Sequence, residues 1–93
     1  LTERIVPSLK RAAGVENVIN IHAVTGAEDF AFYQQKVPGV FFFLGGMPPD
    51  ADPARVASHH TPDFIIDERA FVLGVKALLN VSVDYLLQPV PKK

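Results

Sequence analysis

The chain of 93 residues contains no cysteine. It can therefore form no disulfide and offers no thiolate metal ligand and no cysteine nucleophile, although this absence does not fix the cellular compartment. An excess of charge is also missing, because nine Lys and Arg residues stand against ten Asp and Glu residues, for a formal net charge of −1. Proteins that bind phosphate backbones usually carry a clear basic excess. We therefore expect no nucleic-acid partner.

Long apolar runs are missing too. No uninterrupted run reaches the roughly 18–20 residues that a membrane span needs, so we expect no membrane partner. The first residues, Leu1-Thr2-Glu3-Arg4, show neither an initiator Met nor the layout of a signal peptide. This start indicates a fragment of a longer protein. Localisation stays open, because any signal peptide would lie upstream.

Several catalytic motifs are absent as well. No glycine-rich phosphate loop follows a predicted strand, and Gly26 and Gly45-Gly46 do not make a dinucleotide fingerprint. There is no G-x-S-x-G segment, which argues against serine hydrolase chemistry. Ser58 beside His59 is not a nucleophile and its base, because adjacent residues rarely have the required geometry.

What is present is a globular composition. Hydrophobic residues make up 48% of the chain and charged residues 20%, which is enough apolar surface to offset the entropy lost on ordering. A chain of this length is one domain or part of one, and its independent stability would be marginal.

The first half of the chain predicts helix, strand, helix and strand. Leu1, Ile5 and Leu9 recur at helical spacing and Gly14 follows as a C-cap. Pro7 is unfavourable inside a helix, so the helix either begins near Val6 or is kinked, and we favour the first. Further on, the pattern predicts a strand at 15–24, a turn at Thr25-Gly26 and a short helix at 28–36. An uninterrupted apolar strand is predicted at 40–44.

The second half predicts a loop and a long helix. Residues 45–58 hold two glycines and three prolines, which is typical of a long functional loop. A short extended stretch, 63–66, leads to Asp67 as the N-cap of a helix from Glu68 to about Leu87, stopped by Pro89. We expect this helix to bury one stripe, made of Phe71, Val75, Leu78, Ser82 and Tyr85 or Leu86.

The order helix-strand-helix-strand-loop-helix predicts an α/β fold, a layered helix-sheet-helix domain. Two strands make no stable sheet alone, and a strand covered on both faces needs neighbours on its edges. The pattern therefore indicates that strands of the complete domain lie outside this chain.

Two groups of polar residues are candidates for a site. His59 and His60 lie between the loop and Thr61-Pro62, and imidazole is a common zinc ligand, although a histidine pair on a loop is more often a surface pair. His22 stands alone and is interpreted as structural or solvated. Glu28 and Asp29 follow the first predicted strand, where α/β folds place ligands, but acidic residues there also cap helices.

Three stretches taken together resemble one family, and their ranges are 25–33, 37–45 and 60–64. They are similar to a G-[SA]-E-D-F block, a K-V-P-G-x-F-x-x-L-G strand and an H-[SNT]-P segment. These occur in this order in the C-terminal region of the zinc amidohydrolases that include hippurate hydrolase, N-acyl-amino-acid deacylases and plant auxin-conjugate hydrolases.

The resemblance implies roles for individual residues. His60, directly before Thr61-Pro62, would be the last protein ligand of a site that holds two divalent metal ions. These would be two zinc ions, and manganese or cobalt are the alternatives to zinc. Glu28 and Asp29 would line that site as residues that order it or face the substrate. His59 receives no metal role. No catalytic residue is expected in the chain, since the general-base glutamate and the other ligands would lie upstream of Leu1.

The resemblance also implies an activity for the complete protein. Residues 1–93 would be the C-terminal segment of a metallohydrolase catalytic domain, and an inserted domain that forms a homodimer would lie upstream. The reaction would be hydrolysis of the amide bond of an N-acyl amino acid or a small peptide. We expect the isolated chain to be inactive and to bind zinc weakly. The alternative is a non-catalytic fragment that contributes only packing or partner binding.

Overall fold

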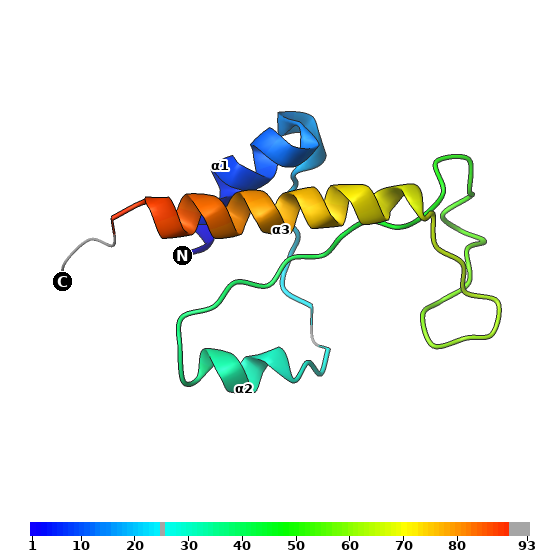
Figure 1. Cartoon of the computed structure of the whole chain (residues 1–93). Coiled ribbons are helices and arrows are strands. Elements are labelled where there is room, and N and C mark those ends of the chain that lie inside the picture. The colour runs from blue at the N-terminus through cyan, green and yellow to red at the C-terminus, as the bar shows by residue number, and fades with distance from the viewer. Residues whose placement is uncertain (25, 90–93) are drawn as a thin grey trace.

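The computed structural model describes residues 1–24 and 26–89. It contains helix α1 (Thr2–Ala13), the 3-10 turn η1 (Val15–Asn17), the short helix α2 (Phe30–Gln34) and the long helix α3 (Arg69–Leu87). Figure 1 shows α1 lying against α3, whereas α2 hangs from two irregular stretches away from this helix pair. The predicted turn at Thr25-Gly26 includes Thr25, which lies outside the described residues.

The predicted α/β fold is wrong, because no β-strand occurs in residues 1–24 or 26–89. Val15–Asn17 forms a 3-10 turn, Val18 is extended, and the rest of the predicted first strand has no regular structure. The predicted strand 40–44 instead runs as single chain beneath α3 (Figure 1). The physical reason is that a strand needs a hydrogen-bonded neighbour. Side-chain pattern alone cannot supply one.

Helix α1 begins at Thr2 rather than near Val6, so Pro7 lies inside it. An interior proline removes one backbone hydrogen bond and is unfavourable by about 3 kcal/mol. The apolar contacts of Ile5, which precedes the proline, favour the longer helix, since that side chain is only 5% exposed. Gly14 ends the helix as predicted. Its φ of 93° suits glycine, and its N–H donates to Lys10 O at 2.9 Å.

The only buried apolar cluster among the described residues joins α1 to α3. It consists of Ile5, Leu9 and Ala12 on α1 and Ala77 on α3. The small side chain of Ala77 lets the two helices approach closely. Val18, Val40, Phe42 and Val81 cover the margins of this cluster.

Polar contacts reinforce the same helix pair. Asp84 of α3 accepts a hydrogen bond from the buried Ser8 hydroxyl and pairs with the Arg11 guanidinium. These two donors lower the pKa of the Asp84 carboxyl, with the Ser8 hydrogen bond as the largest cause. Nearby, Arg4 lies 4.5 Å from the centre of the Tyr85 ring, where a cation–π contact is favourable.

The boundaries of α3 follow the sequence prediction closely. The helix spans Arg69–Leu87, one residue shorter at its start than expected, and it ends before Pro89. The N-cap residue is Glu68 rather than the predicted Asp67, but the Asp67 carboxylate, one residue upstream, accepts a hydrogen bond from Arg69 N at 3.0 Å. Within the helix, Gly74 faces Leu44 so closely that a Cβ atom there would lie 2.8 Å from Leu44 Cδ2. This glycine therefore allows residues 40–44 to lie along α3.

The predicted buried stripe of α3 is wrong. Phe71, Val75 and Leu78 are 51%, 60% and 59% exposed, and the face that contacts α1 carries Ala77 and Asp84 instead. Apolar residues occur on several faces of α3, so their spacing did not identify the face that α1 covers. A row at helical spacing that shares Val75 and Leu86 with the predicted stripe also faces solvent. We call it the exposed stripe, and it consists of Val72, Val75, Leu79, Val83 and Leu86.

The molecule as a whole is open. Its radius of gyration is 15.5 Å, compared with about 12 Å for a compact domain of this length. Its accessible surface is 8242 Å², whereas a folded monomer of 10.2 kDa exposes about 5,300 Å². The chain thus exposes roughly 2,900 Å² more than a self-contained domain would.

Helix α3 is also long and apolar enough to cross a membrane, by length and composition only, with a mean hydropathy of 1.6. The expectation from uninterrupted runs did not reveal this, because Lys76 and Asp84 interrupt the apolar sequence. A core helix of a larger domain has the same composition. The contact of Asp84 with Ser8 and Arg11 is typical of such a core helix.

Candidate functional site

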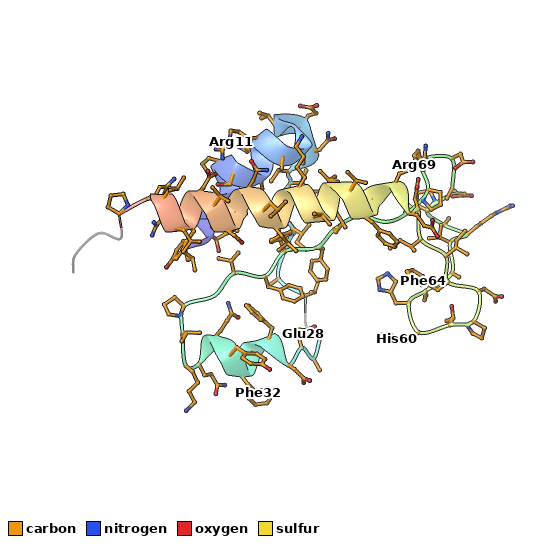
Figure 2. All side chains as sticks on the ribbon, in the orientation of Figure 1. Arg11, Glu28, Phe32, His60, Phe64 and Arg69 are labelled. Atoms are coloured by element: carbon orange, nitrogen blue, oxygen red, sulfur yellow. The ribbon has the colours of Figure 1, made fainter. Side chains whose placement is uncertain are left out.

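The two adjacent histidines lie in a loop whose ends meet at the start of α3. The loop leaves from Gly46 and returns at Asp67, and Asp67 N donates a hydrogen bond to Gly46 O at 2.7 Å. We call residues 47–65 the histidine loop. Figure 2 shows His60 and Phe64 on this loop, with Arg69 at the beginning of the helix above them. The anchored ends fix the loop relative to a rigid helix.

His60 has the unusual backbone of this loop. Its φ is 64°, and it is the only non-glycine residue with positive φ in residues 1–24 and 26–89. Such a conformation is uncommon for residues other than glycine, and it concentrates at functional sites when the surrounding structure holds it. Here the Thr61 hydroxyl donates to Ser58 O at 2.6 Å, which closes a turn around the two histidines.

The two histidines have different surroundings. The His59 ring packs edge-on against Phe64, with ring centroids 4.5 Å apart. His60 has no comparable aromatic contact among the described residues and is exposed. Both histidines are therefore exposed, and only His59 has, in addition, an aromatic packing partner inside the loop. His22 is exposed in the irregular stretch before α2.

The acidic pair lies at the beginning of α2. Glu28 Oε1 accepts a hydrogen bond from Phe30 N at 3.3 Å, which is the capping contact that competes with a site role. Asp29 occupies the N-cap position but makes no side-chain cap hydrogen bond. The helix itself covers only Phe30–Gln34, shorter than the predicted 28–36. Both acidic residues are exposed.

The structure does not bring these candidates into one centre. Glu28 lies at the start of the α2 segment and His60 on the histidine loop, in separate parts of the molecule (Figure 2). Within residues 1–24 and 26–89 no group of three or more His, Cys, Asp and Glu residues could hold a metal ion. The accessible imidazole of His60 fits one ligand position, but a catalytic zinc needs about three protein ligands. Any further ligands must come from other polypeptide segments.

Two features of the site were not evident from the sequence. One is the contact between Gly46 and Ile66 at the base of the histidine loop, where a Cβ atom on Gly46 would lie 2.5 Å from Ile66 Cγ1. The other is the pairing of Asp67 with Arg69, which lowers the pKa of the Asp67 carboxyl mainly through their side-chain hydrogen bond. The Gly45-Gly46 pair was a visible signal of a close approach, but its partner residue was not.

Comparison with known proteins identifies relatives with hydrolase names. The chain is 42% identical to "Putative amidohydrolase YhaA" of Bacillus subtilis over 90% of this chain and 21% of that protein. It is 36% identical to "IAA-amino acid hydrolase ILR1-like 4" of Arabidopsis thaliana over 81% of this chain and 17% of that protein. It is 33% identical to "Thermostable carboxypeptidase 2" of Saccharolobus solfataricus over 83% of this chain and 19% of that protein.

The first two relatives confirm the resemblance to amidohydrolases that the sequence motifs indicated, and the third extends it to a carboxypeptidase. The chain spans only about a fifth of the length of the curated relatives it matches. No family model matches the sequence, and no solved structure matches it.

Proposed function

Since the chain is homologous to one segment of the amidohydrolases, IAA-amino acid hydrolases and carboxypeptidases, we propose that it is part of a metal-dependent hydrolase. The reaction proposed for the complete protein is hydrolysis of the amide bond in N-acyl amino acids or small peptides. Residues 1–93 would be the C-terminal segment of its catalytic domain.

The open shape of the chain supports its role as a segment. The surface in excess of a self-contained domain, roughly 2,900 Å², is of the size that obligate contacts bury. Large apolar side chains are exposed along α3, where Val72 and Leu86 are 75% and 80% exposed. Contiguous apolar patches of this kind mark surfaces that another polypeptide covers. We assign this covering role to the remainder of the hydrolase.

The observation that carries the site is the backbone of His60. A histidine held at φ 64° in a hydrogen-bonded turn, with its ring accessible, is suited to bind a metal ion. In this proposal His60 is the one metal ligand that the chain contributes to a centre of two divalent metal ions. The metal is zinc, and manganese or cobalt are the alternatives. Such metals polarise a carbonyl and activate water.

The other residues of the chain have supporting roles. His59 packs against Phe64 and is not proposed as a metal ligand. Glu28 and Asp29 are proposed to order the site or face the substrate once the remainder of the domain is present. Glu28 already holds the first turn of α2 through Phe30 N. The general base and a homodimer-forming domain are assigned to segments upstream of Leu1.

Metal analysis of the complete hydrolase tests the proposal. We expect His60→Ala to lower bound metal and amidase activity together, because the centre loses a ligand. His59→Ala is the matched control, since it changes the same residue type one position away and removes only the contact with Phe64. The proposal fails if His60→Ala keeps the metal content and activity of wild type.

A further inference from the structure

We propose that Gly46 is a positioning residue for His60, because the contact between Gly46 and Ile66 closes the base of the histidine loop. This inference rests on the proposed metal role of His60. It adds that the placement of His60 depends on a steric contact made by Gly46, which lies 14 positions earlier in the sequence.

At the base of the histidine loop, Gly46 is in close contact with both Asp67 and Ile66. Gly46 O accepts the hydrogen bond from Asp67 N at 2.7 Å, so the backbone at both ends of the loop is in direct contact. The side chain of Ile66 lies directly over Gly46. A Cβ atom on Gly46 would stand 2.5 Å from Ile66 Cγ1 and 2.7 Å from Ile66 Cδ1, closer than real atoms approach. A larger residue therefore fits at this position only if the Ile66 side chain or the backbone at the base shifts.

The requirement at Gly46 is steric rather than conformational. In the described residues Gly14 is the only glycine with positive φ, so the backbone of Gly46 would accept an L-residue. Ile66 is 41% exposed, so its outer atoms have space to move, but taking Cγ1 away from Gly46 requires a change of χ1, and a β-branched side chain has few χ1 rotamers available. An added methyl group would consequently push apart the backbones that share the 2.7 Å hydrogen bond.

Opening the base would displace the histidine loop. Its exit is anchored on α3, because Asp67 caps Arg69 N at 3.0 Å and its carboxylate also pairs with the Arg69 side chain. The start of the histidine loop is anchored by the contact between Gly46 and Ile66. Metal ligands must be held within a few tenths of an ångström, and a site that is about 1 Å too loose binds poorly. Gly46 therefore sets the position of His60 without touching the metal.

Adjacent glycines provide a matched pair of variants in the complete hydrolase. A Cβ on Gly45 would meet nothing within 4 Å, so Gly45→Ala is the control for Gly46→Ala. The repair variant is Gly46→Ala with Ile66→Ala, which removes both Cγ1 and Cδ1 and leaves the Ile66 Cβ at 3.7 Å, an ordinary contact. The probe is zinc alone, titrated against a competing chelator. A second readout is hydrogen exchange of the amides in residues 47–65.

We expect Gly46→Ala to weaken zinc binding by about tenfold or more, as for other residues that orient ligands, and to speed exchange throughout the histidine loop. Gly45→Ala should match wild type in both readouts, and the double variant should recover most of the affinity. A merely structural role of Gly46 would instead predict faster exchange in α1 and α3 as well as in the histidine loop. If Gly46→Ala does not fold, a folded double variant that binds zinc like wild type supports the inference.

The inference is overturned if Gly46→Ala binds zinc like wild type, or if the double variant binds as weakly as Gly46→Ala or does not fold. These outcomes are separate from failure of the proposed function. If His60→Ala leaves zinc binding unchanged, the proposed metal role is wrong. If His60→Ala weakens zinc binding and Gly46→Ala does not, only the positioning role is wrong.

Discussion

Replacing Leu79 by alanine tests whether another part of the polypeptide covers the exposed stripe. Leu79 is 59% exposed in the chain described here. The substitution deletes three carbon atoms, worth about 2.4 kcal/mol when fully buried at about 0.8 kcal/mol each. Because less than half of Leu79 is buried in this chain, the contacts within the chain alone predict that the substitution lowers the free energy of unfolding by about 1 kcal/mol. If the remainder of the complete protein covers the stripe, the loss rises to about 2–5 kcal/mol.

The measurement is urea unfolding of the complete protein, with the loss of free energy of unfolding read from the shift of the midpoint at constant slope. Leu9→Ala is the matched control. Leu9 is 9% exposed inside the contact between α1 and α3, so its replacement is expected to lower the free energy of unfolding by about 2–5 kcal/mol. Equal losses for the two variants support coverage of the stripe. A loss of about 1 kcal/mol or less at Leu79, beside the full loss at Leu9, would refute it.

Three further predictions concern the helix pair and the isolated chain. Asp84→Asn is expected to destabilise the protein above about pH 4 and to have a smaller effect as pH falls. The reason is that the contacts that lower the pKa of Asp84 stabilise the folded state only while its carboxyl is ionised. Urea unfolding at several pH values measures the difference between variant and wild type, and a pH-independent difference would contradict the prediction. Gly14→Ala should reduce the free energy of unfolding by about 1–2 kcal/mol, because φ is 93° there, and an unchanged thermal midpoint would count against the strain. The 93-residue chain alone should lack amidase activity and bind zinc weakly, so one tight site in isothermal titration would disprove the shared-ligand proposal.

The helices could be predicted where local chemistry sets their ends. Gly14 ends α1 through its positive φ, and Asp67 and Pro89 bracket α3, so each boundary depends on residues within a turn of it. The expected strands failed for the opposite reason. The stretches 15–24 and 40–44 have apolar patterns typical of strands, but the hydrogen bonds of a sheet come from residues far away in sequence.

The site was only partly predictable for the same reason. The position of His60 before Thr61-Pro62 was recognised from the motif, whereas its positive φ and the packing of His59 on Phe64 are properties of the folded loop. The sequence showed Gly46 but not the side chain that lies over it. Ile66, 20 positions later, had appeared only as part of an extended stretch.

Helix α3 connects the exposed surface to the histidine loop. A helix with apolar residues on several faces is stable in water only when more than one face is covered. Helix α1 covers the face with Ala77 and Asp84, and the stripe through Leu79 is open. Because Asp67 fixes the exit of the histidine loop to the first residue of α3, any segment that packs on the stripe also restrains the helix that holds His60. We therefore expect Leu79→Ala to weaken zinc binding slightly in the complete hydrolase, and less than Gly46→Ala does.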